Sequence, residues 1–213
     1  MDRSSITLSE VFEGFDSLRY ERPYWRRGLA VAGIDEVGRG CLAGPVIAAA
    51  VVLSPDVDLP NVTDSKALTD IQRREEVQNI TRQARAVAIG IRSARRIDQS
   101  DILRQTLDAM LIAVTRLAVR PDVLLIDGNQ KIRTIIEQHA LVKGDVLSLS
   151  IAAASIVAKV IRDDLMLRLH ERYGQYGWDR NKGYGTPDHL AALREHGPSP
   201  LHRYSFRGVW QGD

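Results

Sequence analysis

The sequence predicts an α/β fold in which helices flank a mixed central sheet and a small helical extension follows. Two short apolar runs separated by glycine-rich residues predict early strands, and helical and strand patterns then alternate. The 213 residues, 44% hydrophobic and 26% charged, suffice for one such core. We expect an N-terminal segment over residues 1–28, a main α/β domain over 29–170 and the helical extension over 171–213.

The first elements expected are strands. Residues 29–34 form one short apolar run, and residues 46–53 form a second that follows several glycines and a proline. The short connection between the two runs predicts an antiparallel hairpin. A modest helix from about Thr69 and a third strand over residues 86–91 come next.

Helical patterns dominate the second half of the chain. Apolar residues recur at three- and four-residue steps over residues 97–118, which predicts one long helix. A buried strand is expected over 122–126, then a weakly patterned segment, then another long helix over 151–169 that begins with small residues. Near the end, Thr186 is the expected N-cap of a short helix that Gly197 and the following proline terminate.

Composition narrows the class of protein. The net charge of +2 is too small to establish binding to nucleic acid. The single cysteine, Cys41, cannot form an intramolecular disulfide, the N-terminus lacks the apolar stretch of a secretory signal, and the longest apolar run is too short to span a membrane. We therefore expect a cytoplasmic monomer without membrane contact.

Acidic residues stand where strands end and helices begin. Asp35 and Glu36 follow the first strand, Asp127 follows the strand over 122–126, and Asp145 precedes a long helix. Taken singly, each is common as a turn residue or as a charge at a helix start. Together at one sheet edge they would repel one another unless a divalent cation joined them. Oxygen ligands favour Mg²⁺ or Mn²⁺, and five histidines without ligand spacing disfavour zinc.

Other site types find less support in the sequence. There is no Walker loop, dinucleotide fingerprint or nucleophile-elbow pattern, although a serine or cysteine nucleophile stays open. Basic residues gather away from the acidic ones, and such a segregation could form a phosphate-binding rim around an acidic pocket. Their groups are Arg22/Arg26/Arg27, Arg92/Arg95/Arg96, Arg180/Lys182 and His202/Arg203/Arg207.

Six motifs resemble those of one known family, in its order. They are Gly33-Ile34-Asp35-Glu36-Val37-Gly38-Arg39-Gly40, Asp64-Ser65-Lys66, Ile126-Asp127-Gly128, Lys143-Gly144-Asp145, residues 152–163 and Lys182-Gly183-Tyr184. This pattern resembles the type 2 ribonucleases H, specifically ribonuclease HII, over about residues 29–208. The related ribonuclease HIII typically has a different glycine motif and a longer N-terminal extension. Asn181 and Thr63 depart from the family's common residues but are not expected metal ligands.

The resemblance implies a ribonuclease H-like sheet in the domain over 29–170, which would then be the catalytic domain. It places the catalytic and metal-binding acids at Asp35, Glu36, Asp127 and Asp145. Two Mn²⁺ or Mg²⁺ ions would activate water and stabilise the leaving oxygen. The expected activity is hydrolysis of the RNA strand of RNA–DNA hybrids and cleavage at single ribonucleotides in duplex DNA, leaving 3′-hydroxyl and 5′-phosphate ends.

Candidate substrate-binding residues follow from the same motifs. The backbone of Gly38-Arg39-Gly40 is expected to hydrogen-bond the ribose 2′-hydroxyl, although a glycine-rich turn is the simpler interpretation. Tyr184 is expected to stack on a sugar, although a packing tyrosine has the same pattern. Ser65, Lys66 and Lys159 are the expected substrate contacts beside them. Lys143, Arg162, His202 and Arg203 are weaker candidates for phosphate contacts, and Ser155 is interpreted as permitting close helix packing.

Two other functions are compatible with parts of the pattern. A nuclease or strand-transfer enzyme of the ribonuclease H-like class that acts on DNA junctions would carry a similar acidic cluster. It would not need Gly38-Arg39-Gly40 together with Tyr184. A non-enzymatic nucleic-acid-binding protein would bind in a salt-sensitive way without needing the acids.

Overall fold

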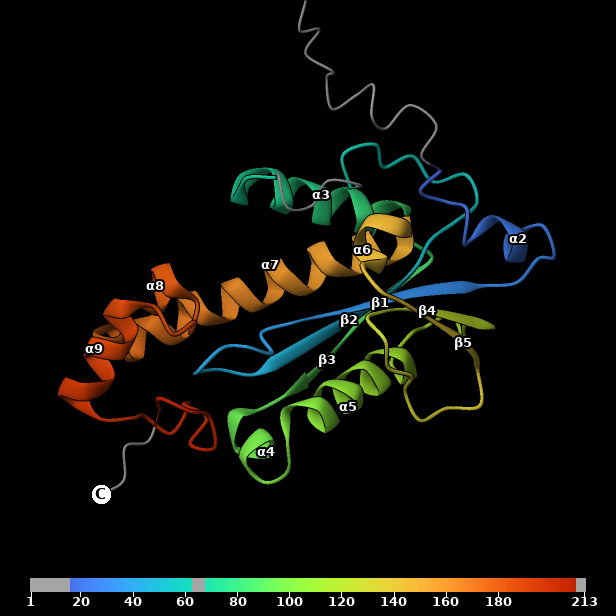
Figure 1. Cartoon of the computed structure of the whole chain (residues 1–213). Coiled ribbons are helices and arrows are strands. Elements are labelled where there is room, and N and C mark those ends of the chain that lie inside the picture. Colours follow the sequence, from blue (N-terminus) through green and yellow to red (C-terminus); the bar gives the residue numbers. More distant parts are fainter. Residues whose placement is uncertain (1–15, 63–67, 210–213) are drawn as a thin grey trace, which may run out of the picture.

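The computed structural model describes residues 16–62 and 68–209 and contains a mixed five-stranded sheet in the order β3-β2-β1-β4-β5 (Figure 1). The strands are β1 (Val31–Val37), β2 (Val46–Val52), β3 (Ala86–Arg92), β4 (Val123–Asp127) and β5 (Glu137–Leu141). Strands β1, β2 and β3 pair antiparallel, whereas β1, β4 and β5 pair parallel. The predicted fold class and the early hairpin are thereby confirmed.

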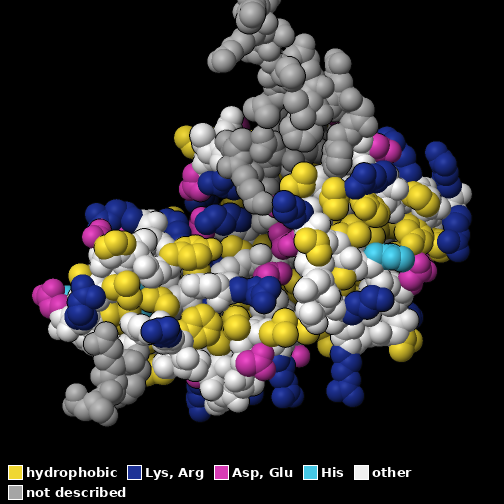
Figure 2. Space-filling view, viewed as in Figure 1, with side chains coloured by type: hydrophobic (Ala, Val, Ile, Leu, Met, Phe, Trp, Pro, Cys, Tyr) yellow, Lys and Arg dark blue, Asp and Glu magenta, His cyan; other side chains and the backbone are white. Residues whose placement is uncertain are grey.

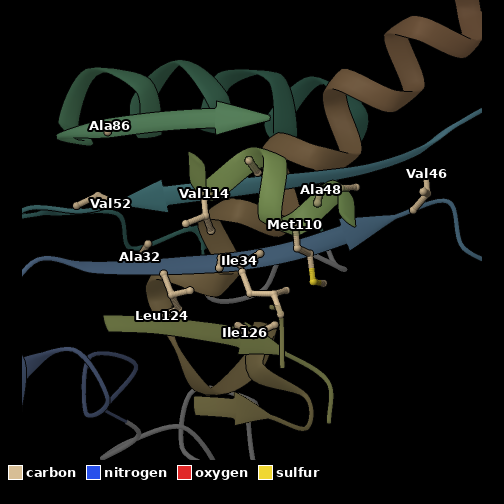
Figure 3. Close-up of a cluster of buried hydrophobic side chains, with 14 of the residues drawn as sticks. Ala32, Ile34, Val46, Ala48, Val52, Ala86, Met110, Val114, Leu124 and Ile126 are labelled. Atoms are coloured by element: carbon tan, nitrogen blue, oxygen red, sulfur yellow. The ribbon is translucent and has the colours of Figure 1, made fainter. Parts of the chain in front are cut away.

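Helices cover both faces of this sheet (Figure 1). Helix α5 (Ile102–Thr115) packs on one face, and α7 (Leu149–Arg172) packs on the other with α3 (Asp70–Gln83) against it. Figure 3 shows the cluster on the α5 face, where apolar side chains of four strands meet those of the helix. Ala32 and Ile34 belong to this cluster. The intervening residues of β1 therefore face α7.

Close backbone approach explains two glycines in the strands. A Cβ atom on Gly33 would lie 2.0 Å from the backbone carbon of Ser150 in α7, and one on Gly90 would lie 2.0 Å from the Ala109 oxygen in α5. Small residues at the start of α7 permit this contact, as the sequence indicated. The sheet and its two main helices are thereby in direct backbone contact.

Two expectations about elements were wrong. The long helix expected over residues 97–118 is two helices, α4 (Ala94–Asp98) and α5. The break occurs because the Asp101 side chain accepts a hydrogen bond from the Arg104 N–H and so begins a new helix. Strand β5 was not predicted, because it is a short edge strand whose partly exposed residues lack a clear alternation.

The C-terminal part is helical and packs at one end of α7 (Figure 1). It contains the 3-10 turn η2 (Gly174–Tyr176), α8 (Trp178–Asn181) and α9 (Pro187–His196). Thr186 accepts a hydrogen bond from the His189 N–H, which confirms it as the N-cap of α9. At the other end of α7 lie the short helices α6 (Gly144–Leu147) and, beyond it, α2 (Arg22–Trp25). Within the described part of the chain, every helix is too short or too polar to cross a membrane.

Candidate active site

The sheet register brings Asp35 and Asp127 together. Strands β1 and β4 are parallel neighbours, and Ile34 pairs with Ile126, so the two aspartates stand one step beyond this pair. Both belong to the residues that face α7, because side chains alternate along a strand. Two aspartates 92 residues apart in sequence therefore meet at the carboxyl ends of adjacent central strands.

Burial and mutual repulsion change the protonation of these carboxyl groups. Burial, followed by the charge of Glu36 and then that of Asp127, raises the pKa of Asp35 well above its usual range, although a hydrogen bond from Ser155 opposes the shift. Burial also raises the pKa of Glu36, and the charge of Asp127 adds to it. The three carboxyl groups are thus close enough to repel one another in a largely buried site.

Asp127 is held by the start of α6. Its Oδ1 accepts a hydrogen bond of 2.7 Å from the Gly144 N–H, and the Asp145 N–H also donates to its carboxylate. The pKa of Asp127 is nevertheless raised, by burial first and then by the charge of Asp145. The Lys143-Gly144-Asp145 motif therefore brings the fourth acid next to the third, and Lys143 adopts a φ of 58° to allow it.

Asp35, Glu36, Asp127 and Asp145 therefore lie near one another, as we expected from the sequence. Their oxygen donors and their mutual repulsion suit a hard divalent cation, which would relieve that repulsion. Among the residues that the structure describes, no three His, Cys, Asp or Glu side chains already lie so as to hold one ion between them. Glu36 instead pairs with the exposed Arg39 guanidinium, 3.4 Å away.

Ser155 has a contact that the sequence did not predict. Its side chain hydrogen-bonds the Asp35 carboxylate from α7. The interpretation of Ser155 as a packing residue alone was therefore incomplete. The missed signal is the spacing on α7, since Ser155 lies one helical turn beyond the residues that touch Gly33.

Two buried arginines hold the Gly38-Arg39-Gly40 loop and the residues that follow it. Arg203 donates to the carbonyl oxygens of Gly38, Arg39 and Gly44, at 2.6 to 3.1 Å. Arg162 donates to the carbonyl oxygens of Pro45, Ala43 and Lys182. Both side chains are fully buried.

Their burial corrects the expectation that these arginines contact phosphates, because buried guanidinium groups saturated by carbonyl oxygens cannot reach a substrate. His202 is also fully buried and leaves the proposed basic rim. Burial lowers the pKa of Arg203 to about 10, which leaves its guanidinium charged at neutral pH. The role of both arginines is to shape the loop.

Tyr184 stands beside the same loop. Its hydroxyl donates a hydrogen bond to the buried Cys41 sulfur, and its side chain is partly exposed, at 42%. The Gly183 oxygen accepts from the Leu42 N–H at 2.8 Å. The loops that carry the two candidate sugar-binding groups are therefore hydrogen-bonded to each other.

A chain of histidines supports the backbone of Tyr184. His202 accepts at Nδ1 from the Ser199 N–H, at 2.9 Å, so its proton lies on Nε2. That Nε2 is 3.0 Å from Nε2 of His189, whose Nδ1–H donates to the Tyr184 carbonyl oxygen at 2.8 Å. The C-terminal segment thus reaches Tyr184 through two buried imidazoles.

The remaining substrate-contact candidates divide into two groups. Ser65 and Lys66 lie outside the described residues. Lys159 is partly exposed on α7 and pairs with Asp163 at 2.8 Å. Lys159 itself lies one helical turn beyond Ser155, and this ion pair directs its ammonium group toward the following turn of α7.

Comparison with known proteins now gives the family. A sequence model of the family described as Ribonuclease HII matches residues 32–209. The chain belongs to the ribonuclease HII family. A ribonuclease HII of Syntrophobacter fumaroxidans is 52% identical over 195 residues, 91% of this chain and 84% of the relative. One of Thermosynechococcus vestitus is 53% identical over 193 residues, 89% of this chain and 90% of the relative.

Solved structures agree with the observed fold. Ribonuclease H2 from Pyrococcus horikoshii superposes with a TM-score of 0.73 at 23% identity, covering 85% of this chain and 95% of that one. Ribonuclease HII from Archaeoglobus fulgidus, solved in a complex with PCNA, gives 0.74 at 27% identity, with 87% and 98% covered. The ribonuclease HII relatives make this chain an endonuclease of the ribonuclease H type, a hydrolase that acts on RNA.

Proposed function

We propose that this ribonuclease HII hydrolyses the RNA strand of RNA–DNA hybrids and also cuts at single ribonucleotides embedded in duplex DNA. The observation that carries the proposal is the convergence of Asp35, Glu36 and Asp127, whose pKa values are raised by burial first and then by neighbouring carboxylates, beside a loop that could approach a ribose closely. The products would be 3′-hydroxyl and 5′-phosphate ends.

Divalent cations fit this donor set. Asp35, Glu36, Asp127 and Asp145 would hold two Mn²⁺ or Mg²⁺ ions, as all-oxygen sites do. The ions would activate water and neutralise charge on the leaving oxygen. A solved ribonuclease HIII that resembles this fold, at 18% identity and a TM-score of 0.69, was determined in complex with Mn²⁺.

The chain's own groups would position the substrate. Gly38 has a φ of 90°, and a Cβ there would lie 2.2 Å from Nε of Arg162, so the loop needs glycine at this position. Fixed by Arg162 and Arg203, the backbone of residues 38–40 would meet the 2′-hydroxyl, and the exposed ring of Tyr184 would lie against the adjoining sugar. Lys159, with Ser65 and Lys66, would contact phosphates.

The proposed setting of the enzyme follows from the same contacts. All four acids come from one chain, which supports action as a monomer. The buried thiol of Cys41 is compatible with the cytoplasm. The proposed division is a catalytic domain over 29–170 and a helical extension over 171–213, and the extension packs onto the domain through an apolar cluster that includes Leu42 and Ala43.

Single substitutions of the acids test the reaction. Asp127→Asn keeps an oxygen that accepts from the Gly144 N–H but removes one negative charge, so we expect turnover to fall at least about 1000-fold. The free energy of unfolding should not decrease, because repulsion in the cluster is relieved. The assay is cleavage of a labelled DNA duplex with one ribonucleotide, in Mn²⁺ and in Mg²⁺, with urea unfolding in parallel. Near-normal turnover of Asp127→Asn would exclude the proposed metal site.

Tyr184 tests the choice of cleavage position. Tyr184→Ala should reduce cleavage at a single ribonucleotide about ten-fold more than cleavage within a long hybrid, because stacking on one sugar is worth about 1–3 kcal/mol. Tyr184→Phe is the matched control, since it keeps the ring and loses only the hydrogen bond to Cys41. Equal losses of Tyr184→Ala on both substrates would remove the proposed stacking role.

A further inference from the structure

A cavity of about 320 Å³ lies where β3, α4 and α5 meet, and Arg92, Arg96 and Arg104 line it. Asp108 also lines it and lies 3.5 Å from the Arg92 guanidinium. Three cations therefore face one described carboxylate. The space is large enough for a group the size of a phosphate.

Two of these arginines lack a carboxylate partner. Within the described ranges, neither Arg96 nor Arg104 forms an ion pair. The two nearest acids in sequence are occupied elsewhere: Asp101 accepts from the Arg104 N–H, and Asp98 accepts from the N–H groups of residues 204–205. Neither Arg96 nor Arg104 is therefore neutralised by a direct ion pair among the described residues.

Arg104 also stands in the first turn of α5, where the exposed N–H groups already make the helix end positive. A cation at this position is unfavourable for the helix itself. The stability of α5 therefore does not explain why an arginine stands at position 104. An anion bound in the cavity would interact favourably with both the side chain and the helix end.

A buried amide adds a polar atom to the cavity lining. Gln105 is 6% exposed, its Nε2 lies 2.9 Å from Ser100 Oγ, and its Oε1 has no partner among the described residues. Rotating the amide by half a turn would let the Ser100 hydroxyl donate to the oxygen and would free the NH₂ group. In either orientation one buried amide atom is left for a ligand.

The cavity and the acidic site lie at the same end of the sheet, where β1 and β3 end. Arg92 ends β3 and pairs with Val46, while Ile47 next to it pairs with Val37 at the end of β1. The acids face α7, whereas Arg92 and α5 lie on the other face, so the two sites use opposite faces of the same end of the sheet.

The surface agrees with this placement. Figure 2 shows Lys and Arg side chains projecting along the lower edge of the molecule, the region where Figure 1 places α4 and α5. Acidic side chains lie near the middle of the same face and also beside some of these cations at the lower edge. A duplex at the acidic site could therefore extend over the α4–α5 edge.

We propose that the cavity lined by Arg92, Arg96 and Arg104 binds a backbone phosphate of the nucleic-acid duplex, away from the cleaved bond. Arginine suits this role because its planar guanidinium donates two parallel hydrogen bonds to phosphate oxygens. The assignment rests on the proposed function, because it takes the duplex to lie at Asp35 and Asp127. It takes Arg92 and Arg96 from the basic group that the sequence suggested for a phosphate-binding rim and adds Arg104, which the sequence did not mark.

The test compares two double variants of equal charge. Arg96→Gln/Arg104→Gln removes the unpaired cavity arginines, and Arg82→Gln/Arg85→Gln removes two cations near the opposite end of β3. Binding of a ribonucleotide-containing duplex is measured in EDTA, where no cleavage occurs, over a series of salt concentrations. We expect the cavity variant to bind about ten-fold more weakly and its slope of log Kd against log salt to fall by about one.

The control double should change Kd less than about two-fold. Arg96→Lys/Arg104→Lys keeps the charge without the paired donors, and it should restore most of the salt dependence but only part of the affinity. If both double variants with glutamine bound the duplex equally weakly, the effect would come from net charge alone, and the assignment would be overturned. An unchanged slope would overturn it as well.

Competition with inorganic phosphate distinguishes a site for a duplex phosphate from a site for free phosphate. Millimolar inorganic phosphate at constant ionic strength should not displace the duplex from the wild-type protein. If phosphate displaces the duplex from the wild type but not from the cavity variant, the cavity is a site for the free anion. The cavity variant should lose kcat/KM for the duplex by about the same factor as it loses affinity. A wild-type protein that binds through these arginines without cutting would overturn the proposed function and leave the cavity assignment standing.

Discussion

At the scale of single residues, buried polar groups decide how the candidate site is shaped. The acids could be predicted because they occupy short motifs at strand and helix ends. Arg203 and Ser155 could not be assigned, because their partners lie on other elements and no local pattern marks them. A buried arginine that binds only carbonyl oxygens resembles a surface cation in sequence.

The paired histidines lead to a prediction about stability and pH. Burial, and then the nearby His189, lower the pKa of His202 from 6.5 to about 4. The unfolded chain therefore binds more protons than the folded one between these values, so stability is present above pH 6.5 and is lost as the pH falls toward 4. From pH 7 to pH 5 this loss amounts to about 2 kcal/mol.

We expect His202→Asn to remove this pH dependence. The variant should be less stable than the wild type at pH 7, yet its free energy of unfolding should fall about 2 kcal/mol less between pH 7 and pH 5. Urea unfolding at several pH values measures the difference. His196→Gln, at an exposed position, is the control and should keep the wild-type slope. Identical slopes in His202→Asn and the wild type would contradict the buried neutral imidazole.

At the scale of elements, the contact of β1 with α7 positions the site. Asp35 lies two residues after Gly33 on β1, and Ser155 lies on α7 beyond the residues that Gly33 touches. The same close contact therefore sets both the packing of the helix and the hydrogen bond to the carboxylate. The small residues of α7 made this closeness predictable from sequence, but the hydrogen bond also required the helix orientation.

Gly33→Ala tests that contact. The new Cβ would lie 2.0 Å from a backbone carbon of Ser150, which no side-chain rotation can relieve. We expect a loss of at least about 2 kcal/mol in the free energy of unfolding, because the helix must move away from the sheet. Gly40→Ala is the control, since nothing lies within 4 Å of its added Cβ, and its stability should change by less than about 0.5 kcal/mol. Similar stabilities for the two variants would refute the backbone contact.

Sequence patterns predicted elements unevenly. Strands β1 to β4 and helices α3, α7 and α9 were expected near their observed positions, because long apolar periodicity or a clear cap marks them. The break between α4 and α5 was missed, since the apolar stripe continues across it while the Asp101 cap interrupts the backbone. Strand β5 was missed because an edge strand needs little burial.

At the scale of the whole molecule, residues from the C-terminal part complete a site that begins at β1, the first strand of the chain. Arg203 binds the Gly38-Arg39-Gly40 loop from a position more than 160 residues later, and His189 supports Tyr184. Isolated bridge pairing between Ala43 and His202 joins the same segments. The helical extension is therefore part of the candidate substrate-binding surface, and a cut after α7 would remove its supports.

Arg203 provides the sharpest test of this long-range connection. Arg203→Met fills similar space but leaves the carbonyl oxygens of Gly38, Arg39 and Gly44 without their donor, at a cost of about 1–3 kcal/mol for each buried group that finds no other partner. Because those carbonyls belong to the loop that would meet the 2′-hydroxyl, KM for a ribonucleotide-containing duplex should rise along with the loss of stability. Arg203→Lys keeps the charge but has fewer donors. Its KM and its free energy of unfolding should therefore lie between those of the wild type and of Arg203→Met. Steady-state kinetics well below the melting temperature separate the two effects, and a folded Arg203→Met protein with wild-type KM would show that the loop holds its shape without the C-terminal part.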